Sequence, residues 1–132
     1  MLISALFCMT ASFTDIKAWQ FSHVFVLNVY KVTSAFPEDE KFGLISQFRR
    51  AAVSIPANIA EGYKKLSRAD KLRFFNIAQG SLEECRYYIV LSKDLGYISN
   101  EETDELVEQI NKASWYLNAY CEGVSRNSGI DR

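Results

Sequence analysis

The chain has 132 residues, 48% of them apolar and 23% charged, with only six glycines and two prolines. This balance excludes collagen-like, low-complexity and intrinsically disordered proteins, and the length suits one domain with a single core. Fifteen basic against sixteen acidic residues leave a net charge of −1, so any binding of nucleic acid requires a local positive patch.

Residues 1–9 form an apolar run, and residues 1–14 contain no lysine or arginine. The apolar run is far too short to cross a membrane, and the missing basic residues argue against a signal peptide. We therefore expect an unstructured or loosely attached extension before the first regular element.

Two helical segments are predicted in the first half of the chain. The first runs from Lys17 to Ser34 with a broad apolar face and ends before Pro37. The second runs from Glu40 to Lys64, and its apolar residues recur at steps of three and four. Proline removes a backbone N–H group and crowds the preceding turn, so we expect a kink at Pro56. Gly62 is expected to weaken the end of this helix.

The third predicted helix begins after Ser67, which forms a pattern resembling a capping box with Asp70. It extends to Leu95, where Gly96 supplies the expected C-terminal cap. Two apolar stripes run side by side along this segment, so it requires more than one neighbouring helix.

The fourth predicted helix begins at a clearer capping box, formed by Ser99 and Glu102. Its apolar residues step by four and three to Val124, which is a heptad seam. Four long helices joined by short loops place sequence neighbours antiparallel. The sequence therefore predicts an all-α, up-down-up-down four-helix bundle over residues 15–124, followed by a frayed polar tail over residues 125–132.

Patterns for catalysis, metal binding and cofactor binding are missing. His23 is the only histidine, which excludes a multi-histidine zinc site and the paired Glu-x-x-His sites of di-iron bundles. Cys8, Cys85 and Cys121 form no Cys-x-x-Cys pair, and the sequence has no phosphate-binding or dinucleotide-binding glycine loop. We predict no catalytic residue, no metal and no cofactor, and the unpaired thiols fit a reducing cytoplasm.

The second helix carries a polar row beside its apolar stripe. Gln47, Arg50, Ser54, Asn58 and Glu61 share one helix face at steps of three and four. The row is either a solvated face or a set of groups hydrogen-bonded between helices or subunits, where they fix register. The candidate interface residues are Arg49, Arg50, Ser54, Asn58, Glu61, Glu83 and Glu84.

Charge is distributed unevenly along the chain. Residues 41–73 carry eight basic and two acidic side chains, a net of +6, whereas residues 99–124 carry one basic and six acidic, a net of −5. A charge run is usually a solvated face, but a cluster of five can also contact phosphates. The candidate nucleic-acid-binding residues lie between the second and third helices: Lys64, Lys65, Arg68, Lys71 and Arg73.

A long ordered motif, Gln47-Phe-Arg-Arg-Ala-Ala-Val-Ser-Ile-Pro-Ala-Asn-Ile-Ala-Glu-Gly62, suggests a family. With Trp19-Gln20, Glu40-Lys-Phe-Gly-Leu44, Gly80-Ser-Leu-Glu-Glu84 and Leu95-Gly-Tyr-Ile98, it resembles the bacterial four-helix bundle family encoded in intervening sequences of large-subunit ribosomal RNA genes. The resemblance covers residues 15–124. It implies a homopentamer without catalytic residues and kinship with the accessory protein of diversity-generating retroelements, which is thought to bind nucleic acid and a reverse transcriptase.

These observations predict a cytoplasmic, non-enzymatic homo-oligomer, a pentamer if the resemblance extends to assembly. Its expected partners are structured RNA, a reverse transcriptase or a ribosome-associated protein, with no membrane contact. The first alternative is a protein-binding scaffold whose acidic fourth helix meets a basic partner. The second is an enzyme or a small-ligand binder.

Overall fold

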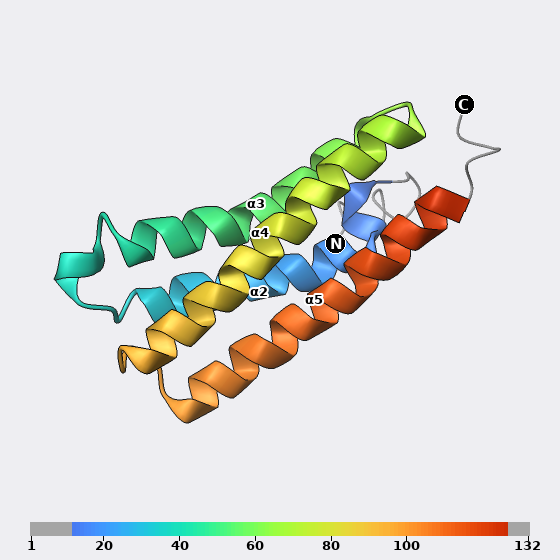
Figure 1. Ribbon diagram of the computed structural model, residues 1–132. Helices are drawn as coiled ribbons and strands as arrows, with labels where there is room; N and C mark the ends of the chain where they lie inside the picture. Colours follow the sequence, from blue (N-terminus) through green and yellow to red (C-terminus); the bar gives the residue numbers. More distant parts are fainter. Residues whose placement is uncertain (1–11, 127–132) are drawn as a thin grey trace, which may run out of the picture.

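The computed structural model describes residues 12–126, which fold into four long helices (Figure 1). The helices are α2 (Lys17–Thr33), α3 (Leu44–Lys64), α4 (Arg68–Asp94) and α5 (Asn100–Arg126), accompanied by the 3-10 helices η1 (Phe13–Asp15) and η2 (Glu38–Glu40). No strand occurs in this range. Successive helices run in alternating directions, and each packs against two others, so that α2 and α4 both contact α3 and α5. The predicted up-down-up-down four-helix bundle is confirmed.

The ends of α4 and α5 follow the predicted capping chemistry. Ser99 Oγ accepts a hydrogen bond from the Glu102 N–H at 3.0 Å, and Glu102 Oε1 accepts one from the Ser99 N–H at 2.8 Å. Gly96 has φ +79°, a left-handed conformation that favours glycine, and its N–H donates to the Lys93 carbonyl. Both predicted signals are confirmed.

The start of α3 differs from the sequence-based expectation. A helix was expected from Glu40, but η2 ends at that residue and α3 begins at Leu44. The Glu40 carboxylate accepts hydrogen bonds from the Leu44 N–H at 3.1 Å and from the Tyr97 hydroxyl at 2.9 Å. Glu40 therefore caps α3 from outside the helix. From Leu44 the helix continues through the buried Pro56 to Lys64, and the kink expected at Pro56 stays a prediction.

The core lies along the bundle axis and takes residues from all four helices. On α5, Leu106, Ile110, Ala113 and Leu117 are at most 1% exposed, which confirms the heptad seam. The largest fully buried side chains on the other helices are Phe25, Val29, Thr33, Phe48, Ile55, Ile59, Phe75, Leu82 and Cys85. Removal of this apolar surface from water is the main stabilising contribution to the fold.

Gly62 has a packing role that the sequence did not predict. It lies in the last turn of α3 and is buried against α4, while the expected weakening of this helix end stays a prediction. A Cβ atom built on Gly62 would lie 2.6 Å from Phe75 Cε1, closer than real Cβ contacts allow. Gly80 on α4 faces open space instead. Gly62 is thus the glycine that permits close approach of α3 and α4.

The two ends of the chain are described only in part. Residues 1–11 of the expected extension and residues 127–132 of the expected tail lie outside the described residues. Ser12 caps η1, because its Oγ accepts from the Thr14 N–H and its own N–H donates to Asp15. At the other end, α5 continues to Arg126. Within the described range, no helix is both long and apolar enough to span a bilayer.

Candidate nucleic-acid interface

The connection between α3 and α4 brings the five predicted basic residues to one end of the bundle. We call Lys64, Lys65, Arg68, Lys71 and Arg73 the basic turn. Lys64 and Arg73 are exposed, and the other three are half-buried. The α2–α3 and α4–α5 connections lie at the opposite end of the molecule (Figure 1).

Aromatic rings and one backbone carbonyl position part of the basic turn. The Lys65 ammonium and the Arg73 guanidinium both lie over the Phe74 ring, 4.9 Å and 4.7 Å from its centroid. Lys71 Nζ donates a hydrogen bond to the Tyr63 carbonyl at 2.8 Å, near the C-terminus of α3. These cation–π and capping contacts fix the cations without neutralising them.

Negative charge near the basic turn is sparse. Arg73 lies 3.8 Å from Asp70 in an exposed ion pair, which is a weak interaction. Among the described residues, Lys64 and Arg68 form no ion pair and no side-chain hydrogen bond. The turn therefore keeps positive charge that a phosphate group can neutralise.

Part of the polar row joins α3 to α4. The hydroxyls of Ser54 and Ser81 share a hydrogen bond of 2.8 Å, and both side chains are partly buried. Asn58 Nδ2 donates to the Ser54 carbonyl at 2.8 Å and to Ser54 Oγ at 2.9 Å. Ser54 is therefore hydrogen-bonded between helices, whereas both hydrogen bonds of Asn58 stay within α3.

Arg49 joins α3 to α2 instead. Its Nε donates to the buried Thr33 hydroxyl at 2.8 Å, and its guanidinium lies 4.5 Å from the centroid of the Tyr30 ring. Thr33 in turn donates to the Val29 carbonyl, so one hydroxyl satisfies both a donor and an acceptor. Arg49 therefore belongs to an interhelical contact that its place in the sequence motif did not specify.

The remaining members of the predicted set lie on the surface. Arg50 and Glu61 are exposed and form no ion pair or side-chain hydrogen bond among the described residues. Glu83 pairs with Arg86 at 3.2 Å within α4. In a single copy of the chain, the solvated-face interpretation describes these three residues.

Tyr88 is a polar contact that the sequence reasoning missed. Its hydroxyl donates to Glu84 Oε2 at 2.6 Å and lies 3.0 Å from Gln47 Oε1 on α3. Burial, followed by the hydrogen bond to Glu84, raises the pKa of Tyr88 to about 12. The sequence pattern did not indicate these hydrogen-bond partners of Tyr88.

An acidic surface lies far from the basic turn. Glu101, Asp104, Glu105 and Glu108 are exposed on the first half of α5, around the half-exposed Val107. Acidic residues in the first turn of a helix also stabilise it through the helix dipole, which accounts for Glu101. The other carboxylates leave this surface negative.

The two described thiols and the histidine lie in different surroundings. Burial raises the pKa of the Cys85 thiol far above its usual range and also raises the pKa of Cys121. His23 is exposed and stacks on Trp19 with ring centroids 5.0 Å apart. The described residues contain no group of three or more side chains that could hold a metal ion.

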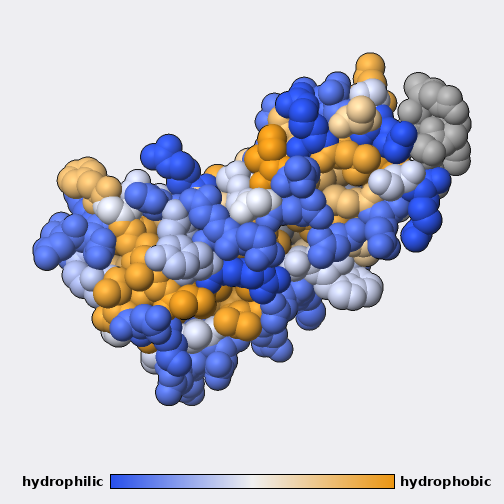
Figure 2. Space-filling view, viewed as in Figure 1, coloured by the Kyte–Doolittle hydropathy of each residue, from blue (hydrophilic) through white to orange (hydrophobic). Residues whose placement is uncertain are grey.

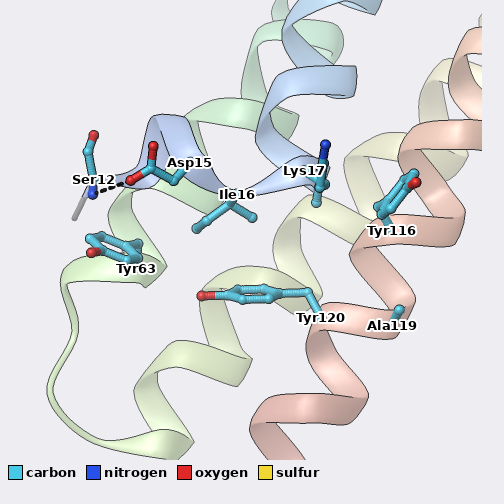
Figure 3. A pocket seen from close by; sticks show the side chains of 9 residues that line it. Ser12, Asp15, Ile16, Lys17, Tyr63, Tyr116, Ala119 and Tyr120 are labelled. Atoms are coloured by element: carbon cyan, nitrogen blue, oxygen red, sulfur yellow. Dashed lines mark hydrogen bonds between the residues drawn. The ribbon is translucent and has the colours of Figure 1, made fainter. Parts of the chain in front are cut away.

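A pocket of about 520 Å³ opens between the start of α2, the end of α3 and the last third of α5 (Figure 3). Tyr63, Tyr116 and Tyr120 are among its lining residues. The sequence pattern did not predict this pocket. Its walls come from segments far apart in the chain, so no local pattern marks it.

The fold defines the protein as a four-helix bundle. The chain belongs to the 23S rRNA-intervening sequence protein family, whose sequence profile it matches over residues 14–119. This match confirms the predicted membership, while kinship with the retroelement accessory protein stays a prediction.

A solved structure shares the fold. It is a crystal structure of a protein of unknown function from the S23 ribosomal protein family of Bacteroides thetaiotaomicron, with a TM-score of 0.73 and 24% sequence identity. The similarity covers 80% of this chain and 95% of that one. No curated protein matches the chain.

Proposed function

We propose that this protein is a non-enzymatic homo-oligomer that contacts structured RNA through the basic turn. The observation that carries the proposal is the clustering of five basic side chains at one end of the bundle, with only Asp70 paired to them. The free thiols of Cys85 and Cys121 suit a reducing cytoplasm, where the proposal places the protein.

Self-association is supported by the outer surfaces of α3 and α4. Val53 on α3 and Ile77 and Tyr87 on α4 expose 40%, 44% and 58% of their surface. Figure 2 shows hydrophobic residues gathered in patches on one face of the molecule, and such exposed patches mark interaction sites. Arg50 and Glu61 on the same surfaces carry opposite charges without a partner in one copy. A second copy would cover the apolar residues and pair the charges.

A ring of copies would multiply the charge of the basic turn. Cyclic symmetry repeats each surface around one axis, so five copies would present about +25 before Asp70 and its equivalents are subtracted. Lysine and arginine on a turn reach phosphates rather than base edges. The RNA contact is therefore expected to depend on duplex shape and salt more than on sequence.

The mass of the assembly and the salt dependence of RNA binding together test the proposal. Light scattering after size exclusion should give a mass several times 15.1 kDa, about fivefold for the pentamer. Fluorescence anisotropy with a structured RNA should show binding that weakens steeply between two salt concentrations. The variant Lys64→Glu/Lys65→Glu/Arg68→Glu should lose binding while keeping its mass. A stable monomer contradicts the assembly, and unchanged RNA binding by the variant contradicts the RNA contact.

The acidic surface of α5 supports a second candidate, a protein scaffold. Glu101, Asp104, Glu105 and Glu108 are exposed around Val107, a combination that suits a basic partner with an apolar anchor. If wild-type protein binds no RNA at low salt, this candidate replaces the first. Its own test is binding of a lysine-rich peptide that Glu105→Lys/Glu108→Lys abolishes.

A further inference from the structure

The pocket beside the basic turn has walls suited to a flat ligand. It lies where η1, α2, α3 and α5 meet, and about 520 Å³ is within the range of small-molecule sites (Figure 3). Tyr120 projects from α5 toward the end of α3, where Tyr63 stands on the other side of the opening. The residues that give the pocket its apolar and aromatic character are Ile16, Ala18, Tyr63, Tyr116, Ala119 and Tyr120.

Two of the tyrosine rings are held in place from behind. Tyr116 stacks on Phe21 of α2, with centroids 5.0 Å apart and an interplanar angle of 20°. Tyr120 packs against the fully buried Phe75 of α4 at 5.1 Å. Rings fixed in this way lose little conformational freedom when a ligand stacks on them.

The third tyrosine connects the pocket to the basic turn. Tyr63 directly precedes Lys64, and its carbonyl accepts the hydrogen bond from Lys71 Nζ at 2.8 Å. The same ammonium lies 5.7 Å from the centroid of the Tyr63 ring. A phosphate bound by the basic turn would therefore lie next to one wall of the pocket.

We infer that the pocket takes one unpaired base of the RNA that the basic turn binds. This inference rests on the proposed function and adds the element that receives the base. An aromatic ligand with a phosphate beside it matches tyrosine walls next to lysines. Bases inside an RNA duplex remain stacked on one another, whereas an unpaired base can turn outward and stack on a protein ring.

Two RNA hairpins that differ by a single unpaired adenosine test the inference on the whole protein. A base stacked on an aromatic side chain contributes about a tenfold gain in affinity, so the bulged hairpin should bind about tenfold more tightly than the fully paired one. Fluorescence anisotropy at one fixed salt concentration measures both affinities.

Two variants of pocket residues then test whether the preference for the bulged hairpin arises in the pocket. Ala119→Phe fills the pocket from the exposed side of α5 without removing a contact, and Tyr120→Leu removes one wall. Each should abolish the preference for the bulge and leave the affinity for the paired hairpin within about twofold. Ala35→Phe, an equal change at an exposed alanine at the opposite end, should keep the preference. Circular dichroism melts confirm that each variant is folded.

The possible outcomes separate the inference from the proposed function. Equal affinity of wild-type protein for the two hairpins overturns the inference and leaves the RNA contact intact. Failure to bind either hairpin overturns both. Free AMP is titrated into the protein without RNA. If the protein binds AMP as tightly as the bulged hairpin, the pocket is a site for a free nucleotide, and the inference is also overturned. If Ala119→Phe keeps the preference for the bulged hairpin, the base binds elsewhere and the inference is overturned.

Discussion

At the end of the bundle formed by the α3–α4 connection, residues 61–73 carry five basic and two acidic side chains, a net of +3. At the other end, residues 38–41 and 93–105 carry eight acidic and two basic side chains, a net of −6. The bundle is thus electrically polarised along its length, although the whole chain has a net charge of only −1. Net charge alone is therefore a poor guide to what this surface attracts.

The two ends also use their charges differently. At the acidic end, the Glu40 carboxylate accepts from the Leu44 N–H and the Tyr97 hydroxyl, so it connects η2, α3 and the α4–α5 loop. At the basic end, Lys65 and Arg73 lie over the Phe74 ring, and of these two only Arg73 has a carboxylate partner, the exposed Asp70. One end uses charge to hold the fold together, and the other leaves it available for a ligand.

Gly62→Ala should have the largest effect, because it forces α3 and α4 apart next to the basic turn. The new Cβ atom meets the buried Phe75 ring at 2.6 Å, and overpacking of this kind costs about 1–3 kcal/mol. Gly80→Ala is the matched control, since nothing lies near it and alanine should stabilise α4 by about 0.5–1 kcal/mol. Urea denaturation measures both changes, and a neutral Gly62→Ala would show that the close approach is not needed.

Glu40→Ala tests the structural use of charge at the acidic end. The change removes a helix cap and leaves the Tyr97 hydroxyl without its acceptor, so the free energy of unfolding should fall by about 1–2 kcal/mol. Glu38→Ala is the control, because Glu38 is exposed at the same end, and its effect should stay within about 0.5 kcal/mol. Equal losses in the two variants contradict a special role for Glu40.

The variants Asn58→Ala and Glu61→Ala test which interpretation of the polar row, hydrogen-bonded group or solvated face, describes each residue. Asn58 donates to two oxygens of Ser54, so its loss should cost about 1 kcal/mol. Glu61 is exposed and should cost less than about 0.5 kcal/mol at concentrations where the protein is monomeric. Chemical denaturation across a range of protein concentrations is the measurement. A large loss at Glu61 that grows with concentration would place this residue in a contact between copies.

The smallest expected effect appears only in alkaline solution. The folded-state pKa of Tyr88 is raised from 10 to about 12, so the folded protein holds this proton more tightly than the unfolded chain does. The resulting stability is fully present below pH 10 and is lost as the pH rises toward 12. In Tyr88→Phe this part of the pH dependence should be missing, which denaturation at pH 9 and pH 11.5 can measure. Identical pH slopes in the two proteins would contradict the raised pKa of Tyr88.

Much of the fold was predictable because its signals are local. Two examples are the capping box of Ser99 and Glu102 and the C-terminal cap at Gly96. Each depends on residues within one helical turn of each other, and both are confirmed. The predicted start of α3 was wrong because Glu40 caps the helix from outside. Its carboxylate also accepts a hydrogen bond from the hydroxyl of Tyr97, 57 residues away. The packing role of Gly62 was missed for the same reason, since its neighbour Phe75 belongs to another helix.

The candidate site was predictable only in its charge. The five basic residues of the turn are close together in the sequence, so their spacing along the chain alone brings them together. The partner of Ser54 is Ser81, and the partner of Arg49 is Thr33, both on other helices. The three tyrosines of the pocket come from two helices and meet only after the bundle forms. Contacts of this kind depend on the register between helices, which helical periodicity does not determine.

The central claim is that RNA binds at the basic end, and matched charge reversals at the two ends test it most directly. Lys64→Glu/Lys65→Glu/Arg68→Glu and Lys31→Glu/Lys41→Glu/Lys93→Glu change the net charge by the same amount at opposite ends of the bundle. A 27-residue helix such as α4 is about 40 Å long, several times the Debye length at physiological salt, so the two ends act separately.

Anisotropy with one structured RNA at physiological salt compares these two variants with the wild-type protein. The proposal predicts at least about a tenfold loss of affinity for the reversal in the basic turn and less than about threefold for the reversal at the acidic end. Equal losses, or full binding by the variant of the basic turn, would contradict it.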